Sequence, residues 1–402
     1  MPRRPPLSGD KQLGLGTRAV HPPRPTPQDG TPVAPVLDPA STYSFDDTAS
    51  FAKASEEKVG AGYVYTRWAN PTIDAFEAAV ADLEGAEEAE AFASGMAAIS
   101  TTFLSACSSG DRIVAARQLY GGTFAILTQT LPRYGIEATL VDVADHAGIE
   151  AALDGASLLY CETIGNPRIE VANLPVLGKL AAAAGVPFVV DNTFASPVLC
   201  RPIEHGADVV IHSATKFLGG HHDLIGGVVC GSPPFLDKMR ELARELGAVL
   251  SPFNAWLALR GIATIQLRVE RSSAGAAKIA RVLDEHAGID GVFYPTLAGG
   301  SGADLAARLL GGHGGGTLAF DVAGGRERTA RFQEALRVIM RAASLGGTHS
   351  LIVHAASVTH TQLTDAELDE AGISEGFCRL SVGLEDHDDL IADLLQALEA
   401  SA

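Results

Sequence analysis

The sequence predicts an α/β protein in which a mostly parallel central sheet carries helices on both faces and a smaller C-terminal α+β domain follows. One observation is the alternation of short apolar runs with helical patterns between residues 71 and 230, which is typical of βαβ units. Another is the change to a mainly helical pattern from Pro233 onward. The third is length, because 402 residues are enough for a sizeable core and two domains.

We expect three segments along the chain: an N-terminal arm at residues 1–60, a large domain at 61–255 and a C-terminal domain at 256–402. The arm contains many prolines and little periodicity. Residues 21–39 indicate an extended segment that lies on another subunit. Residues 46–58 are predicted to form a short helix.

Residues 71–83 show the first strong helical period. Pro71 stands at the start, where its missing N–H costs no hydrogen bond, and Gly85 follows the end, where a left-handed residue is common. The apolar residues that fall on one face are Ile73, Phe76, Val80 and Leu83. This spacing predicts a helix with one buried face.

The remaining elements continue the alternation. Strands are predicted at residues 89–93, 112–115, 138–141, 158–161, 186–193, 208–211 and 227–230. The helices between them are predicted to end near residue 106 and to cover 123–134, 149–153 and 174–184. For the C-terminal part we expect helices at 254–285, 326–341 and 386–399, a strand at 317–322, and a glycine-rich loop at 298–316 with a helix inside it.

Composition and charge exclude several classes of partner. The formal net charge of −18 argues against nucleic acid and anionic membranes. The five cysteines are scattered and form no C-x-x-C pair, which suits reduced thiols in the cytoplasm. No apolar run is long enough to span a membrane, and residues 1–12 lack the apolar core of a signal peptide. We therefore expect a cytoplasmic protein.

The strand predicted at residues 208–211 delivers Lys216 into a glycine-rich turn. Packing would hold the stem of this lysine while its amine faces a cleft. A partly desolvated lysine loses its proton more easily, and a neutral amine can form a Schiff base with an aldehyde. Ser213 and Thr215 flank the lysine with hydroxyls that suit the phosphate of such a cofactor. The competing interpretation is a surface lysine after a strand.

A second strand, at residues 186–193, ends its apolar run in Asp191. A carboxylate is common at the carboxyl edge of a parallel sheet, and one helix and a return strand fit between Asp191 and Lys216. Such a carboxylate can bind the pyridine nitrogen of pyridoxal phosphate and keep it protonated, which makes the ring an electron sink. The alternative is an aspartate that caps the next loop.

Other candidate groups stand at strand and helix junctions. The turn Ser94-Gly95-Met96 precedes a helix, whose N-terminal N–H groups bind phosphate well. Tyr120 can lie on an aromatic ring, although such tyrosines are more often core residues. Tyr65 and Arg67 offer a phenol and a guanidinium that can reach a phosphate. Arg379, inside an apolar run, requires an anionic partner: a substrate carboxylate or a structural aspartate.

Together these motifs resemble the Cys/Met-metabolism family of pyridoxal-phosphate enzymes, which includes cystathionine γ-synthase, cystathionine γ-lyase, methionine γ-lyase and acylhomoserine sulfhydrylases. The resemblance runs in order from about residue 13 to the end of the chain. The matching motifs are Tyr-Thr-Arg-x-x-Asn-Pro-Thr (65–72), Ser-Gly-Met (94–96), Leu-Tyr-Gly-Gly-Thr (119–123), Glu-Thr-x-x-Asn-Pro (162–167), Val-Asp-Asn-Thr (190–193), His-Ser-Ala-Thr-Lys (212–216), Ser-Leu-Gly-Gly (344–347) and Arg-Leu-Ser-Val-Gly-Leu-Glu (379–385).

The resemblance implies a fold-type I transferase fold with pyridoxal 5'-phosphate as cofactor and no metal. It implies that Lys216 forms the Schiff base and moves protons between Cα, C4′ and Cβ of the reacting groups. Asp191 is implied as the partner of the pyridine nitrogen, and Asn166 as the partner of the 3′-oxygen. The implied phosphate ligands within the subunit are Ser94, Gly95, Met96, Ser213 and Thr215.

The resemblance also implies an assembly and a substrate pocket. Tyr65 and Arg67 are implied to reach the phosphate in a neighbouring subunit, so active sites are shared in a homo-oligomer, expected to be a tetramer. Tyr120 is implied to stack on the ring and to activate the incoming amine or the leaving group. Arg379 and the backbone at Ser344 are implied to hold the carboxylate of an amino-acid substrate.

The chain departs from its relatives at a few positions. His349 stands where many members carry Glu or a small residue, and we expect it near the distal end of the substrate or turned away and bonded to backbone. Gly122 stands where methionine γ-lyases usually have cysteine, and His222 where Gly, Ser or Asn is common. The loop 312–316 lacks the usual aromatic residue. These departures affect which substrate is expected, and they do not affect the expected cofactor.

The expected activity is γ-elimination on a sulfur-containing amino acid such as methionine or cystathionine. The main alternative is γ-replacement on O-acetyl- or O-succinylhomoserine, by a sulfhydrylase or a cystathionine γ-synthase. A hypothesis from another class is a metal-dependent hydrolase that uses His221, His222 and Asp223, although adjacent loop histidines lack the usual helical spacing. A non-catalytic binding protein would leave Lys216 without a use.

Overall fold

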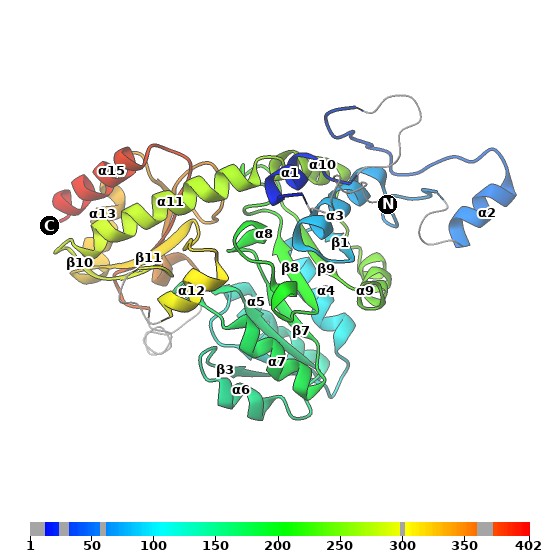
Figure 1. Ribbon diagram of the computed structural model, residues 1–402, viewed down its shortest axis with the longest axis horizontal. Coiled ribbons are helices and arrows are strands. Elements are labelled where there is room, and N and C mark those ends of the chain that lie inside the picture. Colours follow the sequence, from blue (N-terminus) through cyan, green and yellow to red (C-terminus); the bar gives the residue numbers. More distant parts are fainter. Residues whose placement is uncertain (1–12, 24–31, 57–61, 298–301, 360–372) are drawn as a thin grey trace.

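The computed structural model of the chain describes residues 13–23, 32–56, 62–297, 302–359 and 373–402. They form a central sheet and a C-terminal sheet, and the long helix α11 (Ile265–Asp284) extends from the C-terminal sheet toward the central one (Figure 1). The N-terminal segment with α2 (Thr48–Glu56) projects away from both sheets (Figure 1). Within the described ranges, no helix is long and apolar enough to cross a membrane.

Seven strands form the central sheet, in the order β1-β9-β8-β7-β4-β2-β3. The strands from β3 to β8 run parallel to their neighbours, whereas β9 is antiparallel to both β8 and β1. The predicted, mostly parallel sheet is therefore confirmed, and the carboxyl ends of β4, β7 and β8 share one edge. The strands are β1 (Glu88–Phe92), β2 (Arg112–Ala116), β3 (Glu137–Val141), β4 (Leu158–Glu162), β7 (Phe188–Asp191), β8 (Val209–Ser213) and β9 (Gly227–Gly231).

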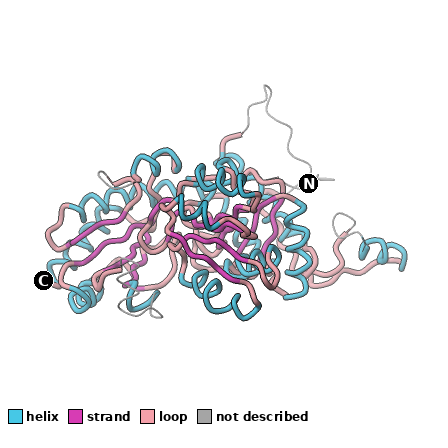
Figure 2. Tube along the Cα trace, turned by 90° about the horizontal axis from the view of Figure 1, so that it is seen from below, coloured by secondary structure: helices cyan, strands magenta, loops and turns pink. Residues whose placement is uncertain are grey.

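Helices cover both faces of this sheet, which explains why its inner strands are continuous apolar runs (Figure 2). The predicted helix at 71–83 is α3 (Pro71–Glu84); the Asn70 side chain caps its start, and Gly85, at φ 78°, closes it. The other helices of this part are α4 (Gly95–Ala106), α5 (Gly121–Ala125), α6 (His146–Ala152), α7 (Leu174–Ala184), α8 (Ser196–Leu199) and α9 (Pro233–Leu246). A π-helical turn, Ile126–Thr130, and a 3₁₀ turn, Leu131–Tyr134, continue α5 where a single helix was expected.

The C-terminal sheet has five strands in the order β10-β11-β14-β13-β12, and all pairs except β12 with β13 are antiparallel. A second apolar core lies between this sheet and its helices. The predicted α+β character is therefore confirmed. The elements are β10 (Ile289–Phe293), α12 (Ala303–Leu309), β11 (Thr317–Val322), α13 (Gly325–Ala335), β12 (Met340–Arg341), β13 (Leu351–His354), β14 (Phe377–Ser381) and α15 (His387–Ala400).

The prediction of one helix over residues 254–285 is wrong, because the chain forms α10 (Pro252–Ile262) and α11 instead. Arg268, near the start of α11, donates from Nη2 to the carbonyl of Gly261 at 2.7 Å and from Nη1 to the carbonyl of Phe217 at 2.8 Å. The end of α10 thus rests against the turn that carries Lys216. The break between the helices lets one buried guanidinium bind carbonyls of both segments.

The prediction of a helix over residues 326–341 is wrong beyond Ala335. The carboxylate of Asp393, on α15, accepts hydrogen bonds from the backbone N–H groups of Arg337, Val338 and Ile339 at 2.9–3.0 Å. These bonds hold the segment outside the helix in a bend that leads into β12. A tertiary contact therefore overrides the local helical pattern.

The N-terminal arm is only partly an extended segment. A short helix, α1 (Leu15–Val20), was not predicted, and the buried Arg18 on it donates to the carbonyl of Asp82. Further along, the carbonyl of Pro35 accepts a hydrogen bond from Trp256 Nε1 at 3.0 Å, so this piece packs on its own chain. Val33 is 91% exposed. The expected contact of residues 21–39 with another subunit stays a prediction, and residues 24–31 of that segment lie outside the described ranges.

Candidate active site

The site lies where β4, β7 and β8 end, at the shared edge of the central sheet. Glu162, the last residue of β4, is in register with Asp191, the last residue of β7. Lys216 follows β8 in a hydrogen-bonded turn, in which its carbonyl accepts from the N–H of Gly220 at 2.7 Å. The strand order therefore brings together a carboxylate pair and the lysine that the sequence singled out.

The amine of Lys216 forms a hydrogen bond with a residue of the C-terminal part. Its Nζ donates to Oγ of Ser344 at 2.9 Å, which joins the central sheet to a loop of the C-terminal part. Burial, and to a smaller extent the charge of Arg379, lowers the pKa of Lys216 to about 8. A larger fraction of this amine is therefore uncharged near neutral pH than of an exposed lysine, which favours its action as a nucleophile.

Ser344 also meets Arg379, which the sequence predicted to bind a carboxylate. Arg379 Nη1 donates to Asn166 Oδ1 at 2.8 Å, and Nη2 lies 3.4 Å from the carbonyl of Ser344. Its Nε is buried and has no hydrogen-bond partner among the residues that the structure describes. Burial lowers the pKa of Arg379 to about 10. A buried guanidinium with a free donor, beside the lysine amine, suits an anionic ligand that has a reactive carbon next to its carboxylate.

Asp191 is buried at the end of β7, with 8% of its surface exposed. Its Oδ1 accepts the backbone N–H of Thr193 at 2.9 Å. Burial raises the pKa of Asp191, while the bonds from Thr193 and the nearby His212 oppose that rise. A cationic ring N–H is the kind of partner that stabilises such a carboxylate as an anion.

The start of α4 approaches β8 closely, and the residues there fit a phosphate. A Cβ on Gly95 would lie 2.8 Å from Ser213 Cβ and 2.9 Å from Ser213 Oγ, so only glycine permits this approach. The Oγ of Ser94 caps the helix by accepting the N–H of Ala97 at 3.0 Å. The open N–H groups of a 12-residue helix and the Ser213 hydroxyl are suitable donors for a dianion.

Two further residues that were predicted to bind the phosphate, Thr215 and Met96, lie beside the start of α4. Thr215 Oγ1 accepts the N–H of Gly226 at 3.1 Å, which fixes the hydroxyl next to the lysine turn. A Cβ on Gly122 would lie 3.0 Å from Met96 Sδ and 2.6 Å from Tyr120 Cε1, so Met96, Gly122 and Tyr120 are packed together. The Tyr120 side chain is 50% exposed, which leaves a ring surface free for stacking.

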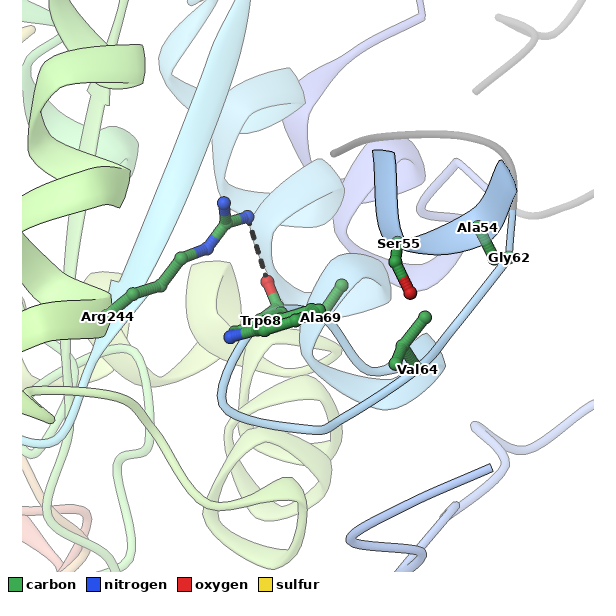
Figure 3. Close-up of a pocket in the computed structure, with 7 residues that line it drawn as sticks. All are labelled: Ala54, Ser55, Gly62, Val64, Trp68, Ala69 and Arg244. Atoms are coloured by element: carbon green, nitrogen blue, oxygen red, sulfur yellow. Dashed lines mark hydrogen bonds between the residues drawn. The ribbon is translucent and has the colours of Figure 1, made fainter. Parts of the chain in front are cut away.

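Within one chain, the structure does not bring Tyr65 and Arg67 to the lysine. Arg67 Nη1 donates to the carbonyl of Arg244 on α9 at 2.7 Å, and its guanidinium carbon lies 5.5 Å from the centre of the Tyr65 ring. Beside them is a cavity of about 130 Å³ whose lining includes Trp68 and Arg244. Figure 3 shows Arg244 directed at the Trp68 carbonyl, with Nη2 at 3.1 Å from it.

His349 and His222 form a pair of imidazoles near the lysine, with ring centres 6.1 Å apart. His349 is exposed, and its Nδ1 lies 3.0 Å from Thr348 Oγ1. Burial lowers the pKa of His222, and the charges of His349 and Lys216 lower it further. A Cβ on Gly347 would collide with the His222 ring, so the two loops are in direct contact.

The metal hypothesis finds no matching geometry in the described residues. His221 Nδ1 lies 2.8 Å from the carbonyl of Gly219, while His222 faces Gly347, so the adjacent histidines point in different directions. In the described part of the chain, no group of three or more His, Cys, Asp or Glu side chains is arranged to hold a metal ion.

Sequence reasoning missed Glu162 as a site residue. It is 5% exposed, and its Oε1 accepts the backbone N–H of Tyr120 at 2.6 Å. The signal was present, because an apolar strand ends in this carboxylate just as β7 ends in Asp191. Nothing near it in the sequence identifies its partner, which lies 42 positions away.

A doubly covered, mostly parallel sheet with a partly desolvated lysine after one strand and a buried aspartate after its neighbour defines the class of fold-type I pyridoxal-phosphate enzymes. The comparisons with known proteins agree. A family model described as Cys/Met metabolism PLP-dependent enzyme matches residues 16–399. The chain belongs to this family, and pyridoxal phosphate is its cofactor.

Three of the similar proteins carry different activities in their names. L-methionine gamma-lyase of Pseudomonas putida is 41% identical over 98% of this chain and 100% of its own length. Cystathionine gamma-lyase of Bacillus subtilis is 41% identical over 84% of this chain and 89% of its own. A crystal structure from Campylobacter jejuni, assigned as an O-acetylhomoserine (thiol)-lyase with N'-pyridoxyl-lysine-5'-monophosphate, has a TM-score of 0.91 and 32% identity, covering 96% of this chain and 100% of that one.

Proposed function

We propose that this protein is a γ-lyase, which breaks the bond between Cγ and sulfur in an amino acid such as methionine or cystathionine. The observation that carries the proposal is that Ser344 connects the amine of Lys216 with the guanidinium of Arg379. Lys216 Nζ donates to Ser344 Oγ at 2.9 Å, and the Ser344 carbonyl accepts from Arg379 Nη2. A substrate carboxylate held by Arg379 brings its Cα next to the amine that must take its proton. The methionine and cystathionine gamma-lyases among the relatives support this choice.

The cofactor's groups are assigned to residues that fit them chemically. Asp191 holds the ring nitrogen, and Asn166 holds the 3′-oxygen. The start of α4 would hold the phosphate, through Ser94, Gly95 and Met96 together with Ser213 and Thr215. Tyr120 would stack on the ring. When bound, pyridoxal phosphate supplies an electron sink for carbanions at Cα and Cβ.

The protein's own groups bind the substrate and move its protons. Arg379 and the backbone of Ser344 orient the carboxylate. The Lys216 amine, whose pKa of about 8 suits proton transfer near neutral pH, takes the Cα proton and serves the protons at Cβ. Tyr120 supplies a proton to the departing sulfur as the Cγ–S bond breaks. With one water consumed, the products are a thiol, ammonia and a 2-oxo acid.

The second candidate is γ-replacement on O-acetyl- or O-succinylhomoserine, favoured by the similarity to the Campylobacter jejuni structure. The test is a panel of methionine, cystathionine, O-acetylhomoserine and O-succinylhomoserine, each with and without sulfide. A γ-lyase releases 2-oxo acid and ammonia from methionine or cystathionine without sulfide. Turnover of an acylhomoserine only when sulfide is present would assign replacement instead and overturn the lyase.

We assign the working form to a homo-oligomer with shared sites, a tetramer built as a dimer of dimers. Tyr65 and Trp68 are large side chains that are 40% and 42% exposed in the single chain. Beside them Arg67 bonds to the carbonyl of Arg244 and, among the described residues, to none of the lysine cluster. Both facts are expected of residues that complete a neighbour's phosphate site. The domain division near residue 255 and a cytoplasmic location are proposals as well; the five cysteines, free and buried, are compatible with that location.

Subunit mixing tests the shared site. Arg67→Ala and Lys216→Ala proteins are each expected to be inactive, yet hybrids of the two should regain activity. One site of each hybrid dimer carries both defects and the other carries none. Random mixing should therefore restore about a quarter of wild-type activity. Native mass spectrometry measures hybrid formation alongside the assay.

The matched control mixes Lys216→Ala with Asp191→Asn, because both changes fall in the same subunit's half of a site. That mixture has no intact site and should stay inactive. Verified Arg67/Lys216 hybrids that also stay inactive would show that Arg67 serves its own chain.

His349 is predicted to contact the distal end of the substrate. A neutral or cationic imidazole suits a side chain without a distal ammonium, such as methionine, better than cystathionine. His349→Glu should shift the ratio of specificity constants toward cystathionine about tenfold, or about 1.4 kcal/mol. Steady-state kinetics on the four-substrate panel measures the ratio, with His146→Glu on α6 as the control. An unchanged ratio would remove His349 from the site.

A further inference from the structure

Glu162 occupies the carboxyl end of β4 at the centre of the site, but no binding or proton-transfer role in the proposed reaction falls to it. Its Oε1 accepts the Tyr120 N–H at 2.6 Å, and its carboxyl group also bonds to the backbone N–H of Asn166. One buried side chain therefore anchors two loops, each of which carries a residue assigned to the cofactor. Neither of these N–H groups belongs to a strand or helix ladder, so Glu162 is what fixes them.

The charges around Glu162 decide its ionisation state. Burial, followed by the charge of Asp191 on the next strand, raises the pKa of Glu162 well above its usual range. The two N–H bonds and Arg379 oppose this effect but are weaker. Two carboxyl groups in register at a dry sheet edge cannot both ionise cheaply.

Asp191 has the better environment for the negative charge. It accepts the N–H of Thr193, and His212 on β8 adds an opposite charge when protonated. Tyr160, fully buried on β4, lies near the same carboxylate. The cofactor's ring nitrogen adds a cation on this side under the proposed function. The pair therefore keeps its negative charge on Asp191 and its proton on Glu162.

The position of that proton affects Arg379 as well. Arg379 is bonded to Asn166, whose backbone N–H is bonded to Glu162. An ionised Glu162 would offset the guanidinium charge that a substrate carboxylate needs. A neutral Glu162 anchors the same loops without competing for that charge.

We propose that Glu162 is a positioning residue that works as a neutral carboxylic acid and fixes the Tyr120 and Asn166 loops. Because it is neutral, the negative charge of Asp191 stays available to bind the cofactor. The positive charge of Arg379 likewise stays available to bind the substrate. What those two charges bind rests on the proposed function. The protonation of Glu162 does not, because it follows from the burial and register of the two carboxyl groups.

Infrared difference spectroscopy on the holoenzyme tests the proton directly. Subtracting the Glu162→Gln spectrum from wild type should leave the C=O stretch of a protonated carboxylic acid at neutral pH. The subtraction cancels other buried carboxyls such as Glu77. In an Asp191→Asn background the same band should titrate at lower pH, because the neighbouring charge is gone. A difference spectrum showing only ionised carboxylate, or a titration unmoved by Asp191→Asn, overturns the proposal.

Variants test the positioning role. Glu162→Gln keeps an oxygen for the Tyr120 N–H and is neutral, so its kcat/KM and its cofactor Kd should stay within about threefold of wild type. Glu162→Ala should weaken both by about tenfold or more, with the loss mainly in KM. Glu137→Gln, at the far end of β3, is the matched control. A glutamine variant about tenfold or more impaired would mean that Glu162 acts as an anion, and the proposal would be wrong.

The experiments distinguish a failure of the Glu162 proposal from a failure of the proposed γ-lyase function. A protonated band in an enzyme that eliminates none of the four substrates rejects the γ-lyase and leaves Glu162 as described. An active γ-lyase without the band rejects the inference alone. The decision does not depend on Glu162→Ala folding, because Glu162→Gln and the infrared band suffice.

Discussion

Lys216→Ala is expected to abolish turnover of every substrate in the panel. Under the proposed function the variant loses both the amine that holds the cofactor covalently and the group that takes the Cα proton, which lies at Ser344. It should also lose the cofactor that borohydride reduction fixes to the wild-type chain. The measurement is product release at saturating substrate, together with mass spectrometry of the reduced protein.

Lys179→Ala is the matched control, because Lys179 is an exposed lysine on α7, away from the carboxyl edge of the sheet. It should keep both activity and the reducible adduct. Equal thermal melting of the two variants would show that the loss is chemical. Wild-type turnover by purified Lys216→Ala would make the assignment of this lysine wrong.

Asp191→Asn is expected to slow Cα deprotonation by orders of magnitude and to weaken cofactor binding. Asparagine keeps the size of the side chain and can still accept the Thr193 N–H, but it cannot stabilise a protonated ring nitrogen. The electron sink is lost with that proton. The measurements are the exchange of the substrate Cα proton with solvent and the Kd of the apo-protein for pyridoxal phosphate.

The pH dependence of cofactor binding gives an independent check on Asp191. Burial raises the pKa of this carboxyl, so wild type should lose affinity as the pH falls and the carboxylate takes up a proton. Asp191→Asn should lack this component, whereas Asp142→Asn, which follows the edge strand β3 of the same sheet, should retain it. Identical pH profiles for wild type and Asp191→Asn would place the ring nitrogen elsewhere.

Strand ends were the part of the site that the sequence could predict. Asp191 and Lys216 follow apolar runs, and parallel neighbours must end at one edge, so local pattern was enough to bring them together. Arg379 was recognisable because a guanidinium inside a buried strand requires an anion. These inferences depend on burial and strand direction, both of which leave a periodic signal in the chain.

Features set by contacts between distant segments were not predictable. The break between α10 and α11 depends on Arg268 reaching the Phe217 carbonyl, 51 positions away. The non-helical segment before β12 depends on Asp393 of α15. Glu162 bonds to a backbone N–H, which carries no residue-specific signal at Tyr120. Tyr65 and Arg67 can be judged only with a second copy of the chain.

The contact between His222 and Gly347 has a consequence for how this site can diversify. A methyl group at position 347 requires the His222 ring to swing out, so the fitness effect of a change at one position depends on the residue at the other. Such epistasis favours an order: a smaller residue at position 222 makes room for a side chain at position 347 without displacing an imidazole.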